Sequence, residues 1–426
     1  MRYRFIILLL AVVTGFAGGC DDLLGTKSDE TTDEIFDEGR IPPGLLSEVE
    51  YVPLFPFLTL GGDGAPLDAP RDIYVGYDEL IYIVDARGLH IVDLAGRPAH
   101  FIPLGEASSV VQDRRFHVYV TARRDTLIDG RTWDLPVVYR YSGLTTGTPR
   151  IEDIIWHPFD DDSRIFTRPD PTDELLDESV EFTGVAVLPD NGVYVTRRGL
   201  ANNAANRSIR PQNAIMIFTP EGINTQALPL SPTRESLRSA VNPAAITTLV
   251  HPPQRANFPP VEDFILAQSP YANGSAPANP SLGDSLRFAV LSIRAVETID
   301  GTEYRPDSQK LLTATDPTKG NGFLYEEFKF LNPVDLAFAA DGTNYIFVLD
   351  AGKDSLFVFT SSGVEGVAPP PGAQSLVPVK VSFGGSGDGA LQFNAPQGVA
   401  YFDKIVYVAD TGNNRISRFR LNTDFE

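Results

Sequence analysis

The stretch from Leu391 to Leu421, LQFNAPQGVAYFDKIVYVADTGNNRISRFRL, carries the clearest structural pattern in the sequence. It holds three short apolar segments, at Gly398–Tyr401, Lys404–Ala409 and Arg415–Leu421. Asp, Gly and Asn residues, which are common in tight turns, separate the last two segments. The stretch therefore predicts three consecutive antiparallel strands joined by short turns.

The same pattern recurs upstream. A second copy runs from Phe330 to Ser361, and its Val348-Leu349-Asp350 aligns with Val408-Ala409-Asp410. A third copy, from Ala69 to Leu94, also matches well. A regular repeat of short strands is typical of repeat architectures. The chain is therefore expected to hold six similar units, the other three being the weaker copies at Phe182–Pro220, Ser108–Tyr141 and Ala245–Ile293.

The C-terminal unit resembles an NHL repeat. The matching residues are Pro-x-Gly-Val-Ala at 396–400, the strand that follows, and Asp-Thr-Gly-Asn-Asn-Arg-Ile at 410–416. The resemblance is strong over Phe330–Leu421 and fair over Phe57–Leu94. It implies that each unit is one four-stranded blade of a propeller. Six units then predict an all-β, six-bladed β-propeller.

The two ends of the repeat region contain related lead-in segments. Phe57 to Pro70 reads FLTLGGDGAPLDAP, and Val381 to Pro396 reads VSFGGSGDGALQFNAP. Each places an apolar strand and a Gly-Gly turn before a repeat, and in the second case that strand is the outer strand of the preceding blade. Residues around Tyr51–Leu60 are therefore expected to supply the outer strand of the last blade. This pairing would close the ring and remove its exposed edges.

The N-terminus has the order of a secretory signal. Arg2 and Arg4 precede an apolar run, Phe5–Val13, that is too short to span a bilayer. Ala17-Gly18-Gly19-Cys20 resembles a lipobox, although Ala17 stands where Leu is common. Residues 1–19 are therefore interpreted as a lipoprotein signal peptide, and Cys20, the sole cysteine, as the lipidated residue. An ordinary cleaved signal with an incidental cysteine is the alternative.

Residues 20–46 are expected to form a disordered acidic tether, and residues 47–426 the propeller. Eight acidic residues lie between Asp21 and Glu38, and such a segment buries too little apolar surface to fold. A lipid anchor at Cys20 predicts membrane attachment in the cell envelope. The outer membrane, at its periplasmic or surface face, is favoured over the inner membrane. Asp21, directly after the cysteine, resembles an inner-membrane retention signal of some bacteria and supports that alternative.

The 426-residue chain carries a formal net charge of -21. A surface this acidic repels phosphate backbones, so no nucleic-acid partner is expected. The charge favours cations or basic partners, and solubility alone is the simpler interpretation.

The longest connections are predicted on one face of the propeller. When strands a to d of a blade run outwards from the axis, the b–c and d–a connections share a face. Short a–b turns are expected on the other face, with Thr360–Ser375 as a long c–d exception. Long loops on a rigid scaffold often carry function, whereas neutral variation in loop length is the alternative. The long connections are Arg123–Leu135, Arg198–Gln212, Ser269–Asp284, Pro158–Glu181 and Asp300–Gly322.

Two aspartates are candidate metal ligands. Asp72 and Asp335 occupy the same place in their repeats, just after the Pro that starts the inner strand. Inner strands line the central channel, so the two carboxylates are expected near its mouth, where oxygen ligands would suit Ca²⁺. The favoured alternative is that each Asp braces the start of its own strand and that no cofactor is bound.

Arginine pairs offer a candidate binding site on the elaborated face. Arg123 and Arg124 are assigned to a position in their blade that is equivalent to that of Arg197 and Arg198 in the next. On an acidic protein they predict an anion-binding spot, with solvated loop charge as the alternative. A structural role is expected for the repeat-turn residues, whose polar side chains satisfy backbone groups: Asp410, Asn413, Asn414 and Arg415.

Two functional hypotheses follow. The first is a non-enzymatic envelope scaffold that binds a protein, peptide or glycan on the loop-rich face; a purely structural subunit of an envelope complex is not separable from it. The second is a metal-dependent propeller lyase or hydrolase with its site at the channel. Of the five histidines, only His157 and His251 lie at strand ends, which is too few for a convincing zinc site. The sequence therefore favours the scaffold over an enzyme.

Overall fold

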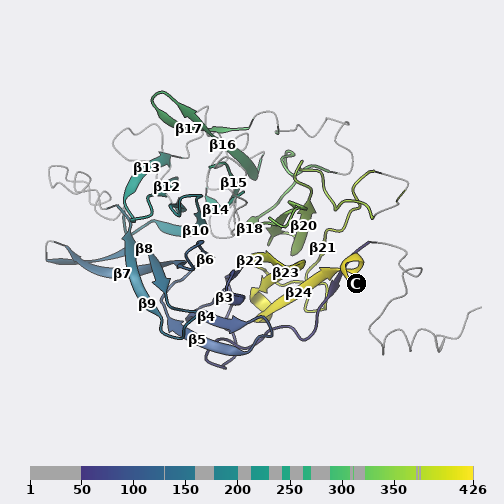
Figure 1. Cartoon of the computed structure of the whole chain (residues 1–426), viewed down its shortest axis with the longest axis horizontal. Helices are drawn as coiled ribbons and strands as arrows, with labels where there is room; N and C mark the ends of the chain where they lie inside the picture. The colour runs from purple at the N-terminus through teal and green to yellow at the C-terminus, as the bar shows by residue number, and fades with distance from the viewer. Residues whose placement is uncertain are drawn as a thin grey trace, which may run out of the picture. The chain divides into compact units, whose positions relative to one another are not determined.

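The computed structural model describes residues 49–128, 130–158, 177–199, 213–229, 242–249, 262–269, 288–307, 310, 322–370, 373 and 376–425. Its strands form six four-stranded sheets arranged as the blades of a propeller, with inner strands near the centre and outer strands at the rim (Figure 1). This confirms the predicted all-β, six-bladed fold. The proposed signal peptide, Cys20 and the tether lie outside the described residues. No helix in the described ranges is long and apolar enough to cross a membrane.

Every blade is antiparallel, and five of the six follow the chain outward from the axis. The first blade holds β2 (Asp72–Val75), β3 (Leu80–Val84), β4 (Gly88–Asp93) and β5 (Pro98–Pro103). The second holds β6 (Ser109–Gln112), β7 (Val118–Ile128), β8 (Arg131–Ser142) and β9 (Arg150–Trp156). The third holds β10 (Glu181–Val187), β11 (Val193–Arg198), β12 (Ala214–Phe218) and β13 (Asn224–Pro229).

The remaining blades complete the ring. The fourth holds β14 (Pro243–Thr248), β15 (Phe264–Gln268), β16 (Val290–Thr298) and β17 (Gly301–Pro306). The fifth holds β18 (Pro333–Phe338), β19 (Ile346–Asp350), β20 (Ser355–Phe359) and β21 (Phe383–Gly384). The sixth combines β22 (Gly398–Phe402), β23 (Ile405–Asp410) and β24 (Arg415–Leu421) with β1 (Tyr51–Pro53).

The N-terminal strand closes the last blade. β1 pairs antiparallel with β24, and Tyr51 lies opposite Leu421. Further along, Leu58 and Ile416 exchange both backbone hydrogen bonds, at 3.0 and 2.7 Å. Tyr51 and Leu58 are 3% and 5% exposed, so the closing segment is part of the core. The closure predicted from the paired Gly-Gly segments is therefore present.

The core lies between neighbouring blades, and each blade contributes large and small side chains to it. The second strand of each blade carries one bulky, fully buried residue at an equivalent register position. Opposite it, most inner strands carry Ala, Val or Thr, such as Ala186 opposite Tyr194 and Ala400 opposite Tyr407. Paired residues of adjacent strands point to the same face of a sheet, so the large and the small side chain together pack against the next blade. The six bulky residues are Tyr82, Tyr119, Tyr194, Ile265, Phe347 and Tyr407, all at most 2% exposed.

Three predicted connections are corrected by the structure. Arg123–Leu135 is not a loop, because β7 and β8 continue as a regular hairpin that projects from the rim (Figure 1). Asp300–Gly322 is not wholly a connection, because β17 pairs with β16 inside it. The a–b connection of the fourth blade spans residues 249–263 and is long. The long connections are therefore concentrated on one face but not confined to it.

Candidate functional site

A cleft opens at the mouth of the central channel, on the face of the b–c and d–a connections. Its volume is about 730 Å³, and the channel below it narrows to a hollow of about 80 Å³. The starts of inner strands and the ends of second strands supply its walls. Six of the lining residues are polar and central to its chemistry: Asp72, Ser109, Arg123, Glu181, Arg198 and Asp335.

One register position forms the floor of this cleft. It is the inner-strand residue that pairs with the end of the second strand, as Asp72 pairs with Val84 and Asp335 with Leu349. Only these two blades place a carboxylate there. The structure thus confirms that Asp72 and Asp335 occupy equivalent places near the channel mouth. In the other blades the position holds small residues: Ser109, Gly184, Ala245 and Gly398.

Each carboxylate on the floor reaches the neighbouring blade. The Val110 backbone N–H donates to Asp72 Oδ2 at 2.7 Å, and the Val399 N–H donates to Asp335 Oδ2 at 2.7 Å. Asp72 Oδ1 also accepts the N–H of Ile73, at 2.7 Å. The carboxylates therefore satisfy inner-edge N–H groups of the next blade, beyond bracing their own strand.

The environment of the floor disfavours the ionised forms of Asp72 and Asp335. Burial raises the pKa of Asp72 to about 7. Burial and the nearby Asp72 carboxylate raise the pKa of Asp335 well above its ordinary value. Among the described residues, no Lys, Arg or His nitrogen forms an ion pair with either group. Asp72 can therefore exchange a proton near neutral pH, and Asp335 holds its proton more tightly than an ordinary aspartate does; perturbed carboxyl groups of this kind are common at functional sites.

These pKa shifts predict how stability depends on pH. A carboxyl group with a raised native-state pKa binds protons that the unfolded chain has released. Its stabilising contribution is complete below the unfolded pKa of about 3.9 and is lost as the pH rises through about 7. We expect the free energy of unfolding, measured by urea titration, to fall between about pH 5 and pH 8 less steeply in the Asp72→Asn, Asp335→Asn double variant than in the parent. Equal slopes would contradict the assignment, and Glu106→Gln, in an exposed side chain, is the control.

The repeat turn of the sixth blade holds the loop that precedes it. Asp410 is fully buried and accepts the Asn394 N–H, Asn413 Nδ2 and Arg415 Nε, each at 2.8 Å. Arg415 also donates to the carbonyls of residues 388, 389 and 392 at 2.9–3.0 Å. Asn414 Oδ1 accepts the Ala69 N–H at 2.8 Å, which links the sixth blade to the first. These contacts give the four turn residues a structural role.

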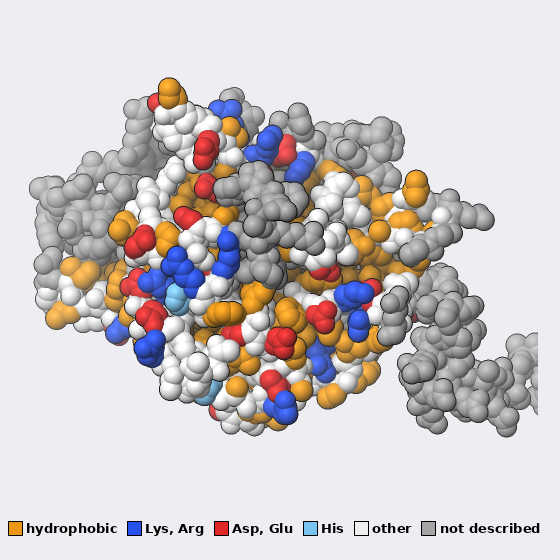
Figure 2. All heavy atoms as spheres, viewed as in Figure 1, with side chains coloured by type: hydrophobic (Ala, Val, Ile, Leu, Met, Phe, Trp, Pro, Cys, Tyr) orange, Lys and Arg blue, Asp and Glu red, His pale blue; other side chains and the backbone are white. Residues whose placement is uncertain are grey.

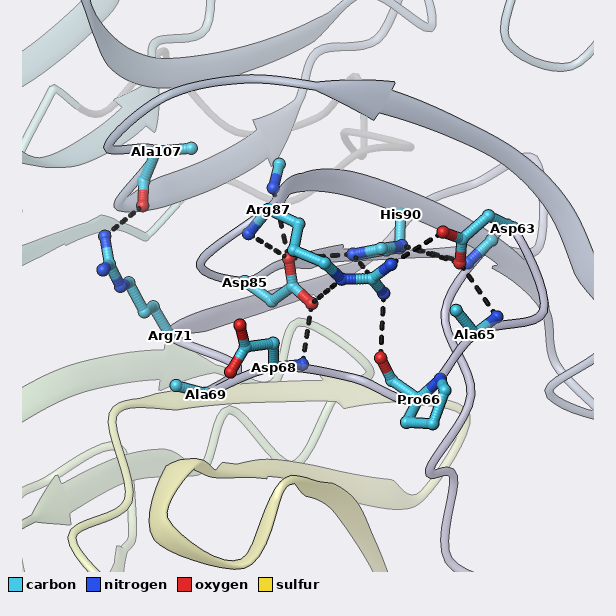
Figure 3. A network of polar contacts seen from close by, with 12 residues as sticks. Asp63, Ala65, Pro66, Asp68, Ala69, Arg71, Asp85, Arg87, His90 and Ala107 are labelled. Carbon is cyan, nitrogen blue, oxygen red and sulfur yellow. Dashed lines mark hydrogen bonds and ion pairs between the residues drawn. The ribbon is translucent and has the colours of Figure 1, made fainter.

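The first blade builds the same support from different residues (Figure 3). Asp85, fully buried, accepts three backbone N–H groups and contacts His90 Nε2 at 2.8 Å. Arg87 bridges Asp63 at 2.7 Å and the Pro66 carbonyl at 2.9 Å. Sequence reasoning missed this network, although Asp85 aligns with Asp350 and Asp410. The alignment was the available signal, because Asp350 and Asp410 end a second strand and Asp85 directly follows one.

The strand register shows that the two arginine pairs do not occupy equivalent positions in their blades. Thr121 and Thr196 hydrogen-bond to equivalent inner-strand carbonyls, at 3.5 and 3.3 Å, so the position of Arg123 corresponds to that of Arg198. The pairs are therefore offset by one residue, and the predicted equivalence of Arg197 with Arg123 is wrong. Because successive strand residues point to opposite faces, only Arg123 and Arg198 line the cleft.

The cleft arginines are already engaged. Arg123 donates to Asp134 Oδ2 and to the carbonyls of residues 134, 178 and 180, all at 2.7–2.8 Å. Arg198 pairs with Glu181 at 2.7 Å. Away from the cleft, Arg124 lies over the Tyr139 and Trp156 rings, and Arg197 contacts His157 Nε2 at 2.9 Å. Anion binding by these four arginines stays a prediction, and the contacts shown hold loops and strands together.

Hydroxyl groups link adjacent blades around the rim of the cleft. Ser108 Oγ donates to the Phe182 carbonyl at 2.7 Å, and Thr183 Oγ1 donates to the Pro243 carbonyl at 2.8 Å. Thr411 Oγ1 does the same to the Pro70 carbonyl at 2.6 Å. Sequence reasoning did not find these residues, because a single Ser or Thr near the end of a strand carries no distinctive pattern.

The described residues contain no group of three or more His, Cys, Asp or Glu side chains placed to hold a metal ion. Asp72 and Asp335 alone would offer Ca²⁺ fewer oxygens than the six to eight it takes. Of the two candidate histidines, His157 lies against Phe182 and Arg197, and His251 lies outside the described residues. Calcium in the channel therefore stays an untested prediction.

Comparison with known proteins supports the repeat. Residues 393–419 match the family model described as NHL repeat, so the sixth blade carries an NHL repeat. No curated protein matches the chain. An auxiliary nutrient binding protein from Bacteroides ovatus is 12% identical, with 88% of this chain and 78% of that chain covered and a TM-score of 0.49. Virginiamycin B lyase from Staphylococcus aureus is 12% identical, with 88% and 99% covered and a TM-score of 0.39.

Proposed function

We propose that this protein is a non-enzymatic binding scaffold of the cell envelope, anchored through lipidated Cys20, whose ligand occupies the cleft at the channel mouth. The observation that carries the proposal is the cleft itself, about 730 Å³ in volume and built on the starts of inner strands. Ligand sites are concave and few in each protein. The ligand class is a protein segment, peptide or glycan.

The strands and loops around the cleft are suited to binding because contacts between successive blades hold them in one arrangement. Side chains link successive blades, from Thr411 to the first blade, Arg71 to the second, Ser108 to the third and Thr183 to the fourth. A preorganised site loses little entropy when a ligand binds, which favours affinity.

The lining favours a polar ligand. Hydroxyl, carboxylate and guanidinium groups supply much of the wall, and the aromatic ring of Phe182 is only 4% exposed. On the face seen in Figure 2, acidic and basic side chains are interspersed rather than gathered into one patch of a single sign. A polar cleft of this kind suits peptide amide groups or sugar hydroxyls, which need hydrogen-bond partners when they leave water.

The metal-dependent lyase or hydrolase remains the alternative. Its support is the pair Asp72 and Asp335: burial raises the pKa of Asp72 to about 7, which would suit proton transfer near neutral pH, and raises the pKa of Asp335 as well. The described residues supply no set of three metal ligands around them. The scaffold needs no such set and is therefore preferred.

Blocking the cleft tests the proposal. Val334 is half-buried and lines the cleft on β18, so Val334→Trp would place a large ring inside it. We expect ligands selected from peptide and glycan arrays to bind this variant at least about tenfold more weakly, because the ring occupies their volume. Calorimetric titration of the selected ligands measures the change.

Ile151→Trp is the matched control, because Ile151 is 50% exposed on β9, an outer strand. Its ligand affinities should equal those of the parent. Two results would overturn the proposal: ligands that bind both variants equally, and arrays on which no peptide or glycan binds above background. Chemical conversion of a bound ligand would favour the alternative.

A further inference from the structure

We propose that the ligand of this cleft presents a basic group, an alkylammonium or guanidinium, to the floor formed by Asp72 and Asp335. The inference rests on the proposed function and names the chemical class that the site selects. It follows from how charge is distributed among the residues that line the cleft.

The carboxylates on the walls are matched by arginines, whereas Arg71 has a backbone carbonyl as its partner. Arg198 pairs with Glu181 at 2.7 Å, and Arg123 pairs with Asp134 at 2.7 Å and with Glu106 at 3.6 Å. The fifth wall charge, Arg71, donates to the Ala107 carbonyl at 3.2 Å. A ligand therefore meets walls whose opposite charges are already close to one another.

The floor differs from three other deeply buried acidic sites in this protein and resembles a fourth, Asp350, which accepts only backbone N–H groups and lines no described part of the cleft. Asp85 has His90 at 2.8 Å, Asp410 has Arg415 at 2.8 Å, and Glu365 has Lys329 at 2.7 Å. At these three sites a cation compensates a carboxylate that is withdrawn from water.

Asp72 is 8% exposed and Asp335 is half-buried, yet neither has a cation among the described residues. Both line the cleft as well as the channel. Asp335 and Asp72 are also close enough for one carboxylate to raise the pKa of the other. The floor is therefore the part of the described cleft where negative charge lacks a partner and where a cation from a ligand would supply it.

An organic cation fits this floor better than a metal ion. Each carboxylate already accepts backbone N–H groups, and Ca²⁺ needs six to eight oxygens that the described residues do not bring together. An ammonium or guanidinium needs only a few acceptors, and it forms charge-assisted hydrogen bonds with carboxylates. The net charge of -21 also attracts basic ligands over longer distances.

The same geometry makes the interaction depend on pH. Protonated carboxyl groups attract a cation weakly, so binding strengthens as Asp72 and Asp335 lose their protons. The other charged groups that face the cleft come from the start of β2, the turn before β6, and β7, β10 and β11: Arg71, Glu106, Arg123, Glu181 and Arg198.

The test compares how tightly two peptides bind to the full-length protein. One is a capped tripeptide with a central lysine, and the other is identical except that its lysine is Nε-acetylated. Both are titrated by calorimetry or NMR. We expect the lysine peptide to bind at least about tenfold more tightly, because its ammonium contributes charge-assisted hydrogen bonds. Its affinity should also rise about tenfold from pH 6 to pH 8, a range in which the lysine itself stays charged.

Variants of the floor separate charge from folding. Asp72→Asn with Asp335→Asn should abolish both the preference for lysine and its pH dependence. Asp335→Ser is a second variant that removes the charge. Serine is compatible with this register position, because the second blade carries Ser109 there and the Ser109 Oγ accepts the Val185 N–H at 3.3 Å. Asp300→Asn, in the exposed turn between β16 and β17 and outside the cleft lining, is the matched control and should leave the preference intact.

Equal affinity of the two peptides, or no binding of the lysine peptide at millimolar concentration, overturns the inference. Displacement of the lysine peptide by stoichiometric Ca²⁺ that the floor variants no longer bind also overturns it, in favour of a metal site. These failures are distinct from failure of the proposed function. An uncharged ligand whose binding is lost in Val334→Trp would keep the scaffold and reject the basic group.

Discussion

A chain that begins at Gly61 instead of Glu50 is expected not to form a stable propeller. It lacks β1 and Leu58, which supply the outer edge of the sixth blade. Tyr51 and Leu58 are 3% and 5% exposed, and loss of each large buried side chain costs about 2–5 kcal/mol. The total, about 5 kcal/mol or more, is comparable with the whole stability of many domains. The loss also leaves β24 with an unpaired edge, which promotes aggregation.

Thermal and urea unfolding, followed by far-UV circular dichroism and size-exclusion chromatography, would measure the effect. The control chain begins at Glu50 and keeps every residue that pairs with β24, so it should unfold cooperatively. Adding a peptide of residues 49–60 to the shorter chain should restore part of the stability, because it can replace the missing strand. A shorter chain that unfolds with the same midpoint as the control would refute the closing role of β1.

Replacing Asp410 by Ala is expected to lower the free energy of unfolding by about 3–5 kcal/mol, because it removes one partner of a buried ion pair. Arg415, whose side chain is 13% exposed, would lose its Nε partner at 2.8 Å. The Asn394 N–H and Asn413 Nδ2 would lose acceptors at the same time. The loop they hold leads into the sixth blade, so the effect should extend to ring closure.

Asp388→Ala is the control for this prediction, because Asp388 is exposed and lies in the same loop. Its effect should stay within about 0.5 kcal/mol, as for most surface substitutions. Urea titrations of the parent and both variants provide the comparison. If Asp410→Ala changed stability no more than Asp388→Ala, the turn would not be holding the loop. Asp85→Ala should resemble Asp410→Ala, because Asp85 supports the equivalent loop of the first blade.

These two predictions concern the closing strand β1 and the turn that supports the sixth blade. Both features position the residues of the candidate site. Asp335 bonds to Val399 in the blade that β1 closes, and Asp72 lies on the other side of that blade. An open ring would separate the two carboxylates. Ligand binding at the floor and closure of the ring are therefore expected to be linked, with ligand raising the unfolding temperature of the closed form.

Parts of the site were predictable from the chain because they depend on near neighbours. Asp410, Asn413, Asn414 and Arg415 occupy one short turn whose composition indicates its geometry. Their long-range partners were not predictable, because residues 388–392 and Ala69 reach the turn only after the ring has closed. The same holds for His90, which lay in an expected strand while its contact with Asp85 went unnoticed.

The arginine pairs show where sequence spacing is insufficient. A one-residue difference in register decides which of two adjacent side chains enters the cleft, since successive strand residues point to opposite faces. Alignment of degenerate repeats does not fix the strand register to within one residue. The structure does, through the equivalent contacts of Thr121 and Thr196.

The class of fold, the number of blades, the closing strand and the equivalence of Asp72 and Asp335 could all be predicted from the chain alone. These follow from periodicity and turn chemistry, which are local properties of the chain. Only the tertiary structure decided which side chains meet across blades: the arginines that enter the cleft, the hydroxyls that link the rim, and the unmatched charge of the floor. The reason is physical, because burial, register and the distance between charges arise only when segments far apart in the chain are packed together.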